Sequence, residues 1–156
     1  MLDVAHWFMG IDTPLVSFGA GYHSPTRLPE QVPDIVDLVW KYDQFLATYS
    51  TRRDEWANTF WGDLGTLAVN RNMLRLKPFP TPENRNPEIL ELKGAESGTE
   101  HIANHIRNFL DCVRSRQKPA ADAETLAKST IACLLAAMSV RTGRAYRFDG
   151  KSAREV

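Results

Sequence analysis

The chain has 156 residues, of which 43% are hydrophobic and 24% charged, and its 19 Lys and Arg residues balance 19 Asp and Glu residues. This composition is typical of one globular domain, excludes a disordered or collagen-like chain, and provides no basic surface for nucleic acid or anionic membranes. The longest apolar run covers residues 131–138, far short of the roughly 20 residues that span a bilayer.

The first half of the chain is predicted to alternate short strands with proline-rich loops. A helix over residues 1–10 ends at Gly10, but nothing before Leu2 can cap its start, which suggests a chain truncated at its N-terminus. The clearest strand covers residues 35–42, whose alternating pattern places Val36, Leu38 and Trp40 on one face. A turn at 43–44 makes a hairpin with the next strand. The strands predicted in this half are 15–22, 35–42, 45–51, 58–61, 65–69, 73–77 and 89–92.

The second half of the chain is predicted to be helical. A capping box at residues 97–100 begins a helix that runs to about Arg116, and Asp122 caps a second helix that ends at Gly143. The apolar stripe of the first is Ile102, Ile106, Phe109, Leu110 and Val113; that of the second is Leu126, Thr130, Cys133, Leu134, Ala137 and Met138. The alanines at 132, 136 and 137 allow the second helix to pack closely against a sheet or the other helix. With a short strand at 145–149, the sequence predicts an α+β fold: an open mixed, mostly antiparallel β-sheet of six or seven strands, with two long helices on one face.

Two motifs resemble cofactor or metal sites but are incomplete. Residues 19–21, Gly-Ala-Gly, resemble the start of a dinucleotide fingerprint, but Ser24 stands in place of the third glycine and Pro25 follows. The glycines are interpreted instead as residues that let a strand end and turn. His101 and His105 have the i, i+4 spacing of zinc ligands without the H-E-x-x-H pattern, so they are interpreted as part of a solvated helix face. No metal site is predicted.

The remaining chemistry of the sequence allows more than one interpretation. His6, beside Trp7, fits either a core position or the wall of a cleft. Tryptophans and tyrosines at strand spacing usually build a core or an interface, and a carbohydrate platform is the alternative. Cys112 and Cys133 fit no metal spacing and are interpreted as reduced core residues of a cytoplasmic protein, since the N-terminus has no secretory signal.

Several segments together resemble the C-terminal domain of the Gfo/Idh/MocA oxidoreductases. They are residues 2–10 (LDVAHWFMG), 14–19 (PLVSFG), 60–67 (FWGDLGTL), 108–116 (NFLDCVRSR) and 141–149 (RTGRAYRFD). The resemblance covers nearly the whole chain, and its most specific part is residues 108–116 with Pro119 after them. Members of this family join a Rossmann domain that binds NAD or NADP to a second domain, of α+β fold, that shapes the substrate site and contributes an open sheet to oligomerisation. They oxidise or reduce sugars and polyols by hydride transfer.

The resemblance implies that residues 1–156 form a single substrate and oligomerisation domain that is not catalytic by itself. The family's glycine-rich fingerprint and catalytic lysine belong to the Rossmann domain. Its catalytic histidine precedes an H-x-x-D-x-x-x-W stretch whose D and W match Asp3 and Trp7, so the histidine would fall just before Met1. No catalytic or cofactor-binding residue is therefore transferred to this chain.

Two other functions stay open from the sequence: a stand-alone module that binds a small molecule or a protein partner, and one subunit of a split dehydrogenase. The DNA upstream of the start would distinguish them, because a continuous frame encoding G-x-G-x-x-G indicates a fragment. If substrate contacts survive, the family's layout implies His6, Tyr22, His23 and Trp61, with a sugar-like ligand. Because strand 35–42 is apolar on both faces, a homodimer through the open sheet face is also predicted.

Overall fold

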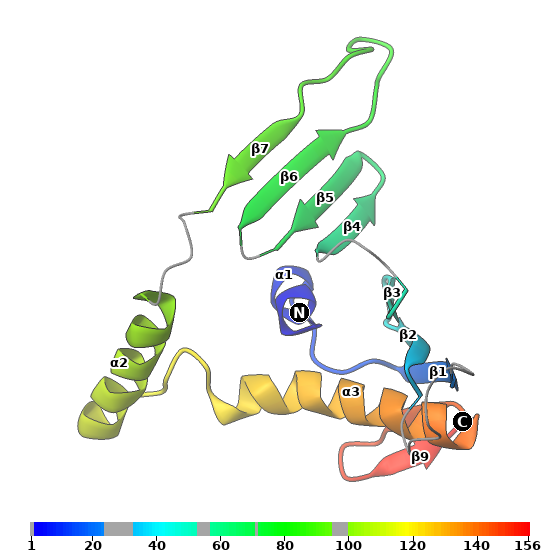
Figure 1. Cartoon of the computed structure of the whole chain (residues 1–156), viewed down its shortest axis with the longest axis vertical. Coiled ribbons are helices and arrows are strands. Elements are labelled where there is room, and N and C mark those ends of the chain that lie inside the picture. Colours follow the sequence, from blue (N-terminus) through cyan, green and yellow to red (C-terminus); the bar gives the residue numbers. More distant parts are fainter. Residues whose placement is uncertain (1, 24–32, 53–56, 71, 95–99) are drawn as a thin grey trace. The chain divides into compact units, whose positions relative to one another are not determined.

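The computed structural model describes residues 2–23, 33–52, 57–70, 72–94 and 100–156, which contain three helices and nine strands. Figure 1 shows them in chain order. Contacts divide the chain into two units, one of residues 2–54 and 123–156 and the other of residues 55–122. The elements are α1 (Leu2–Met9), β1 (Val16–Tyr22), β2 (Ile35–Lys41), β3 (Leu46–Ser50), β4 (Asn58–Gly62), β5 (Gly65–Val69), β6 (Met73–Pro78), β7 (Leu90–Lys93), α2 (Glu100–Ser115), α3 (Ala123–Thr142), β8 (Tyr146–Phe148) and β9 (Ala153–Glu155).

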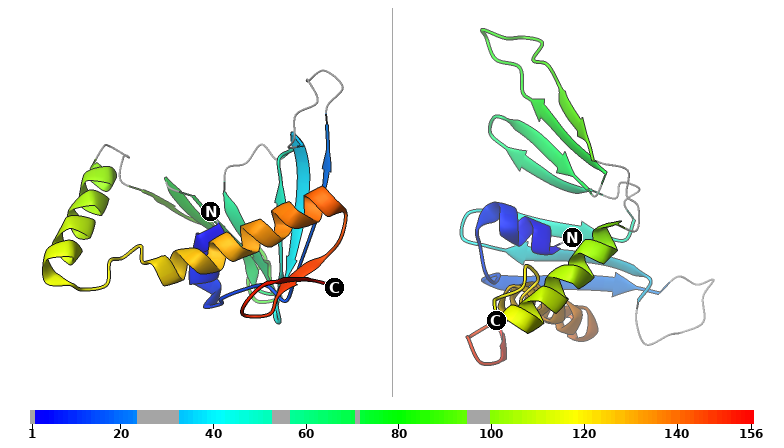
Figure 2. Two further views of the ribbon diagram at one scale, coloured as in Figure 1. Left: turned by 90° about the horizontal axis from the view of Figure 1, so that it is seen from below. Right: turned by 90° about the vertical axis from the view of Figure 1, so that its left-hand side faces the viewer.

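The first unit is a five-stranded antiparallel sheet with strand order β3-β2-β1-β8-β9. The predicted hairpin pairs β2 with β3, with Val39 opposite Thr48, and β1, whose pairing was not predicted, lies on the other side of β2 with Phe18 opposite Val39. At the other edge of β1 the C-terminal hairpin joins the sheet, with Ser17 opposite Tyr146. The helix α3 lies along one face of this sheet, as Figure 2 shows.

Small residues let α3 approach the sheet closely. The side chains that it buries are Ala132, Leu135, Ala136 and Ser139. On the strand beneath, an added Cβ at Gly19 would lie 2.8 Å from Val140 Cγ2, and the Ser139 hydroxyl accepts a hydrogen bond of 2.8 Å from the Gly19 N–H. Glycine is therefore needed inside β1 because the helix occupies the space of a side chain. The interpretation of these glycines as the end of a strand is wrong.

The predicted apolar stripe of α3 is also wrong. Leu126, Leu134 and Met138 are exposed by 47%, 58% and 37%, and the buried face consists of Leu135 with the small residues Ala132, Ala136 and Ser139. The close packing expected of the alanines is confirmed for Ala132 and Ala136. By length and a mean hydropathy of 1.3, α3 is the one described helix that could cross a membrane, a test that the core helix of a soluble protein also passes. The exposed apolar stripe and the high mean hydropathy have the same cause, because α3 carries apolar residues on more than one side.

The core of the first unit lies between β2, β3, α1 and α3. Trp40 and Tyr42 are 4% exposed and pack with Ala132 and Ala136, and the Trp40 indole N–H donates to the Ala132 carbonyl at 2.9 Å. The residues packed around them are Leu2, Ile11, Leu38, Phe45 and Ala47. The indole therefore fills the core and satisfies its one donor there.

The second unit contains an antiparallel meander of strand order β4-β5-β6-β7 and the helix α2. Two-residue and short turns join β4 to β5 and β5 to β6, and the Asn70 carboxamide accepts from the Asn72 N–H in the second turn at 2.8 Å. The predicted apolar stripe of α2 is exposed throughout, by 47% to 64% at Ile102, Ile106, Phe109, Leu110 and Val113. The helix α2 is thus strongly amphipathic, and in the part of the chain that the structure describes no other element buries its apolar side.

The predicted α+β class with open antiparallel sheets is confirmed, and most elements lie within two residues of their expected bounds. The strands form two sheets of five and four rather than one, and the strand β9 was not predicted. Gly10 and Gly143 end their helices with positive φ angles of 62° and 69°, as expected for glycine at this position. The capping box at 97–100 lies largely outside the described residues. The expectation of one domain over residues 1–156 stays a prediction.

Candidate substrate and interaction surfaces

His6, the first predicted substrate contact, lies in the interior of the first unit. Its side chain is 7% exposed, and its Nε2 is 2.6 Å from the Tyr42 hydroxyl, with the two rings edge-to-face at 5.6 Å. Its Nδ1 is buried with no hydrogen-bond partner among the described residues. Burial lowers the pKa of His6 below its ordinary value, against the opposing influence of Asp12 and Asp3. The imidazole is therefore neutral at pH 7 and is not presented to solvent.

Tyr22 and His23 lie at the other end of β1. Tyr22 pairs with Ile35 and is 60% exposed, and His23 follows it in an exposed position. The opposite end of this strand, Val16, pairs with Lys41, the neighbour of Tyr42. A strand of seven residues is roughly 20 Å long, so the structure does not bring Tyr22 and His23 together with His6.

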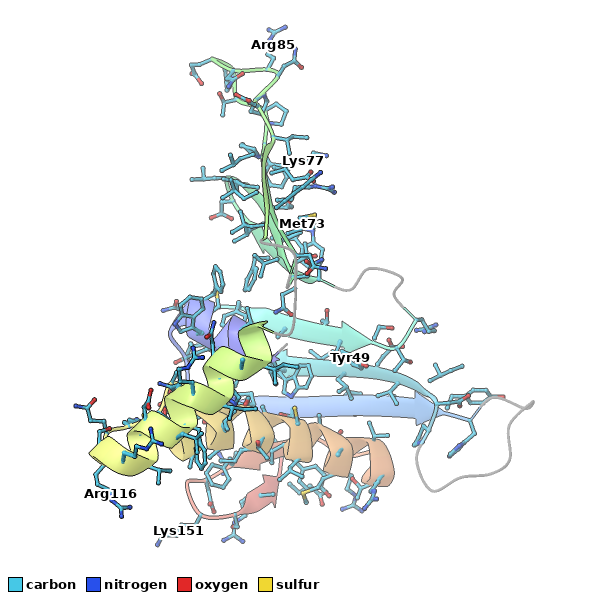
Figure 3. All side chains as sticks on the ribbon, turned by 60° about the vertical axis from the view of Figure 1, so that its left-hand side comes forward. Tyr49, Met73, Lys77, Arg85, Arg116 and Lys151 are labelled. Atoms are coloured by element: carbon cyan, nitrogen blue, oxygen red, sulfur yellow. The ribbon has the colours of Figure 1, made fainter. Side chains whose placement is uncertain are left out.

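Trp61, the fourth predicted contact, lies on one face of the four-stranded sheet and is 65% exposed. In the register of the sheet Trp61 is opposite Thr66, and Thr66 is opposite Lys77, so the three share one face. Figure 3 shows Met73 and Lys77 extending from the same side of β6. An exposed indole beside hydroxyl and ammonium donors has the chemistry to bind a hydroxyl-rich ligand.

A second row of side chains lies on this face beside the Trp61 row, which is Trp61, Thr66 and Lys77. It runs across the four strands as Thr59, Ala68, Arg75 and Glu91. The Arg75 guanidinium donates to Glu91 Oε2 at 3.0 Å, so these two charges neutralise each other. Lys93, opposite Met73, lies on the same face as Lys77, so a ligand carboxylate or hydroxyl would meet the ammonium groups of these two lysines.

The opposite face of the same sheet is apolar across all four strands. Its residues, taken from the register, are Phe60, Leu67, Val69, Leu74, Leu76, Leu90 and Leu92. Leu76, Leu90 and Leu92 are exposed by 38%, 49% and 54%. A shallow depression of about 240 Å³ at one end of the sheet is lined mainly by Val69, Met73, Leu74 and Leu92, which is smaller than a typical small-molecule pocket.

The five-stranded sheet also has an open face, on the side opposite α3. Phe18, Val39 and Leu46 lie on it and are exposed by 45%, 38% and 65%. Asp37 on the same face is paired with Arg52. Large apolar side chains on a solvent-facing sheet usually mark a contact surface.

The residues that the structure describes contain no group of three or more His, Cys, Asp or Glu side chains that could hold a metal ion. Gly19 and Gly21 are pressed against α3, where an added Cβ would lie within 3 Å of Val140 in both cases. Cys112 and Cys133 are both free, and Cys133 is exposed rather than in the core as predicted.

Sequence reasoning missed two partners at these sites. The strand pattern gives Tyr42 no link to His6, because the two residues are 36 positions apart. Lys77 was not connected with Trp61, because only the strand register places them on one face. The alternation of β4, β5 and β6 indicates which residues within each strand share a side, but it does not indicate which residues of neighbouring strands lie opposite one another.

Comparisons with known proteins concern the fold. No family model and no curated protein matches the chain. A solved structure from Thermotoga maritima, assigned as an oxidoreductase, is similar with a TM-score of 0.64 at 17% identity over 92% of this chain. An oxidoreductase from Agrobacterium radiobacter, in complex with NAD+, L-tartaric acid and magnesium, is similar with a TM-score of 0.55 at 15% identity, again over 92% of this chain. The chain spans 43% and 45% of their lengths, and at these identities the likeness establishes the fold.

Proposed function

We propose that this chain is the substrate-shaping and dimerisation domain of an NAD(P)-dependent oxidoreductase of the Gfo/Idh/MocA type. The observation that carries the proposal is the match of nearly the whole chain to less than half of two oxidoreductases. The motifs at residues 2–10, 108–116 and 141–149 support the choice of family. The chain by itself does not catalyse hydride transfer, because the nucleotide and the catalytic residues belong to a second domain. Its free cysteines are compatible with a cytoplasmic location, which we also propose.

The proposed substrate is a sugar, a polyol or a related hydroxy acid. The Trp61 row supports this class, since an indole ring stacks on the C–H face of such a molecule while Thr66 and Lys77 donate to its hydroxyl or carboxylate oxygens. The L-tartaric acid in the Agrobacterium radiobacter complex is also a hydroxy acid. In this role the domain binds and orients the substrate, and the hydride acceptor is held by the other domain.

Calorimetric titration of the chain with NAD, NADH, NADP and NADPH should show no binding in the micromolar range. The reason is that the only glycine pair resembling a fingerprint is covered by α3. A one-to-one complex at micromolar affinity with any of the four nucleotides would contradict the proposal that the nucleotide is bound by another domain. The control is a full-length oxidoreductase of this family, which should bind its nucleotide in the same buffer.

Replacing Trp61 by alanine should weaken the binding of a hydroxyl-rich ligand by about tenfold, the loss expected for one stacking contact of roughly 1–1.5 kcal/mol. The measurement is an NMR titration with sugars, polyols and hydroxy acids that follows the backbone amide and the indole N–H resonances. Trp7→Ala is the matched control, since Trp7 is 79% exposed on α1 and lies outside this face. Ligand shifts confined to residues 101–142 would show that the site is elsewhere.

We also propose a homodimer that packs through the open face of the five-stranded sheet. The exposed Phe18, Val39 and Leu46 support it, since their burial would remove apolar surface from water. A stable contact of this kind buries at least about 1,200 Å² in total. A two-fold axis would place this face against the same face of a second chain, so each apolar side chain would be buried once in each chain.

A further inference from the structure

The attachment of α1 to the first unit depends on a buried polar pair. His6 is the one residue of α1 that is buried, and its Nε2 and the Tyr42 hydroxyl are 2.6 Å apart. Tyr42 in turn stacks on Phe45, with ring centroids 4.6 Å apart and an interplanar angle of 13°. The chain after α1 continues from this point, with the Ile11 N–H donating to the His6 carbonyl at 3.1 Å. The imidazole is thus the polar anchor of the helix in the core.

The rest of α1 buries its apolar side chains only in part. Trp7 is 79% exposed, and Phe8 and Met9 keep 43% and 38% of their surface in water. Leu2 and Ile11, at the two ends, are partly buried against the core. A helix of eight residues is also too short to be stable in isolation. Its position therefore depends on the state of His6.

We propose that His6 is a proton-sensitive latch, which holds α1 against the core when the imidazole is neutral and releases the helix when the imidazole is protonated. The Tyr42 hydroxyl can donate to Nε2 of one neutral tautomer or accept from the Nε2–H of the other, so this hydrogen bond forms with either. In the Nε2–H tautomer the buried Nδ1 carries a lone pair and no N–H donor is left without an acceptor. A protonated imidazole has two N–H donors. Tyr42 can accept one of them, and the other, at the buried Nδ1, has no acceptor among the described residues. Protonation therefore buries a charge with one unsatisfied donor, which strongly favours exposure of the ring.

The charged groups around His6 do not compensate this cost. On α1 itself Asp3 is exposed, and after the helix Asp12 forms an ion pair of 2.6 Å with Lys128 of α3. Asp3 and Asp12 favour the cation and Lys128 opposes it, while burial is the largest influence and lowers the pKa of His6. The remaining titratable neighbours are neutral, because burial raises the pKa of Tyr42 and the pKa of the Cys133 thiol of α3. The docked helix thus prefers the neutral ring.

The direction of the pH dependence follows from this preference. Because the pKa of His6 is lower in the docked state than its ordinary 6.5, the released state binds more protons below pH 6.5. Docking is therefore fully favourable above pH 6.5 and is lost as the pH falls through the docked-state pKa. One proton per release event raises the equilibrium constant for release by up to tenfold per pH unit in this window.

The test is hydrogen exchange of the α1 amides in the full chain between pH 5 and pH 7, corrected for intrinsic exchange rates, together with NMR titration of the His6 ring. In the wild-type chain the protection of α1 should fall by severalfold or more towards pH 5. His6→Phe keeps a ring in the core without a titratable group and should remove this dependence. His23→Gln, at an exposed position, should leave it unchanged.

Two results would overturn the latch: protection of α1 that is the same at pH 5 and pH 7, or a pH dependence that persists in His6→Phe. Tyr42→Phe provides an independent measurement if His6→Phe does not fold. It keeps the imidazole but removes its one partner, so exchange of the α1 amides should rise at least severalfold already at pH 7. Unchanged exchange in Tyr42→Phe would equally contradict the proposal.

Discussion

Replacing Gly19 by valine should destabilise the five-stranded unit by about 3 kcal/mol, the upper part of the range for overpacking a close-packed interior. The first added carbon alone would lie 2.6 Å from Leu38 Cδ2 and 2.8 Å from Val140 Cγ2. Relief requires α3 to move away, which also stretches the hydrogen bond from the Gly19 N–H to the Ser139 hydroxyl. Urea unfolding followed by circular dichroism would measure the loss as a lower midpoint at unchanged slope.

Ala20→Val is the matched control for this substitution. It introduces a side chain of the same size on the same strand, but Ala20 is exposed on the face opposite α3, where there is room. Its effect on the free energy of unfolding should stay within about 0.5 kcal/mol. Equal losses for the two variants would mean that β1 does not tolerate valine for reasons unrelated to the helix.

Replacing Val39 by aspartate should weaken the proposed homodimer by at least 100-fold. The substitution occurs twice in a symmetric contact, and each copy buries a carboxylate without a partner at a cost of several kcal/mol. The folding of the monomer should change little, because Val39 is 38% exposed on the open face. Light scattering should therefore give twice the 17.6 kDa chain mass for the wild type at tens of micromolar and a single chain mass for the variant.

Leu64→Asp provides the control for this experiment. Leu64 is 85% exposed in the turn between β4 and β5, so the same kind of substitution there should leave the dimer intact. A wild-type chain that is monomeric at tens of micromolar would refute the dimer. A dimer that resists Val39→Asp but dissociates with Leu90→Asp would place the contact on the apolar face of the four-stranded sheet instead.

Most of the secondary structure was predictable because its signals are local. The alternation in residues 35–42 and the glycines that end the helices depend on neighbours a few positions away, and β2, Gly10 and Gly143 agree with the expectation. The division into two sheets was not predictable in this way, since it depends on which strands pair. The strand β9 was missed because its three residues, Ala-Arg-Glu, carry no apolar pattern. It is fixed by pairing with β8 and by the Arg144–Glu155 ion pair.

From the sequence, individual candidate residues could be identified, but the surroundings of each residue could not. The sequence identified His6 and Trp61 as candidates but left open whether His6 packs inside or lines a cleft. Tyr42 decides this question by burying the imidazole, and that contact is fixed by tertiary structure. The apolar stripe of α3 was predicted wrongly for a related reason. Large apolar residues are the usual signal for a packed face, but next to the glycines of β1 the helix buries the small residues Ala132, Ala136 and Ser139 together with Leu135.

The position of β8 beside β1 has a consequence for synthesis of the protein on the ribosome. One edge of β1 pairs with β2 soon after both emerge, but at its other edge Ser17 acquires its strand partner only when Tyr146 has been made. At roughly 5–20 residues per second the ribosome needs on the order of 6–25 s to make the intervening chain. During this time β1 presents unpaired N–H and C=O groups that another nascent chain can join. Pauses in translation before Tyr146 would therefore lower the yield of native protein without any change in its final stability.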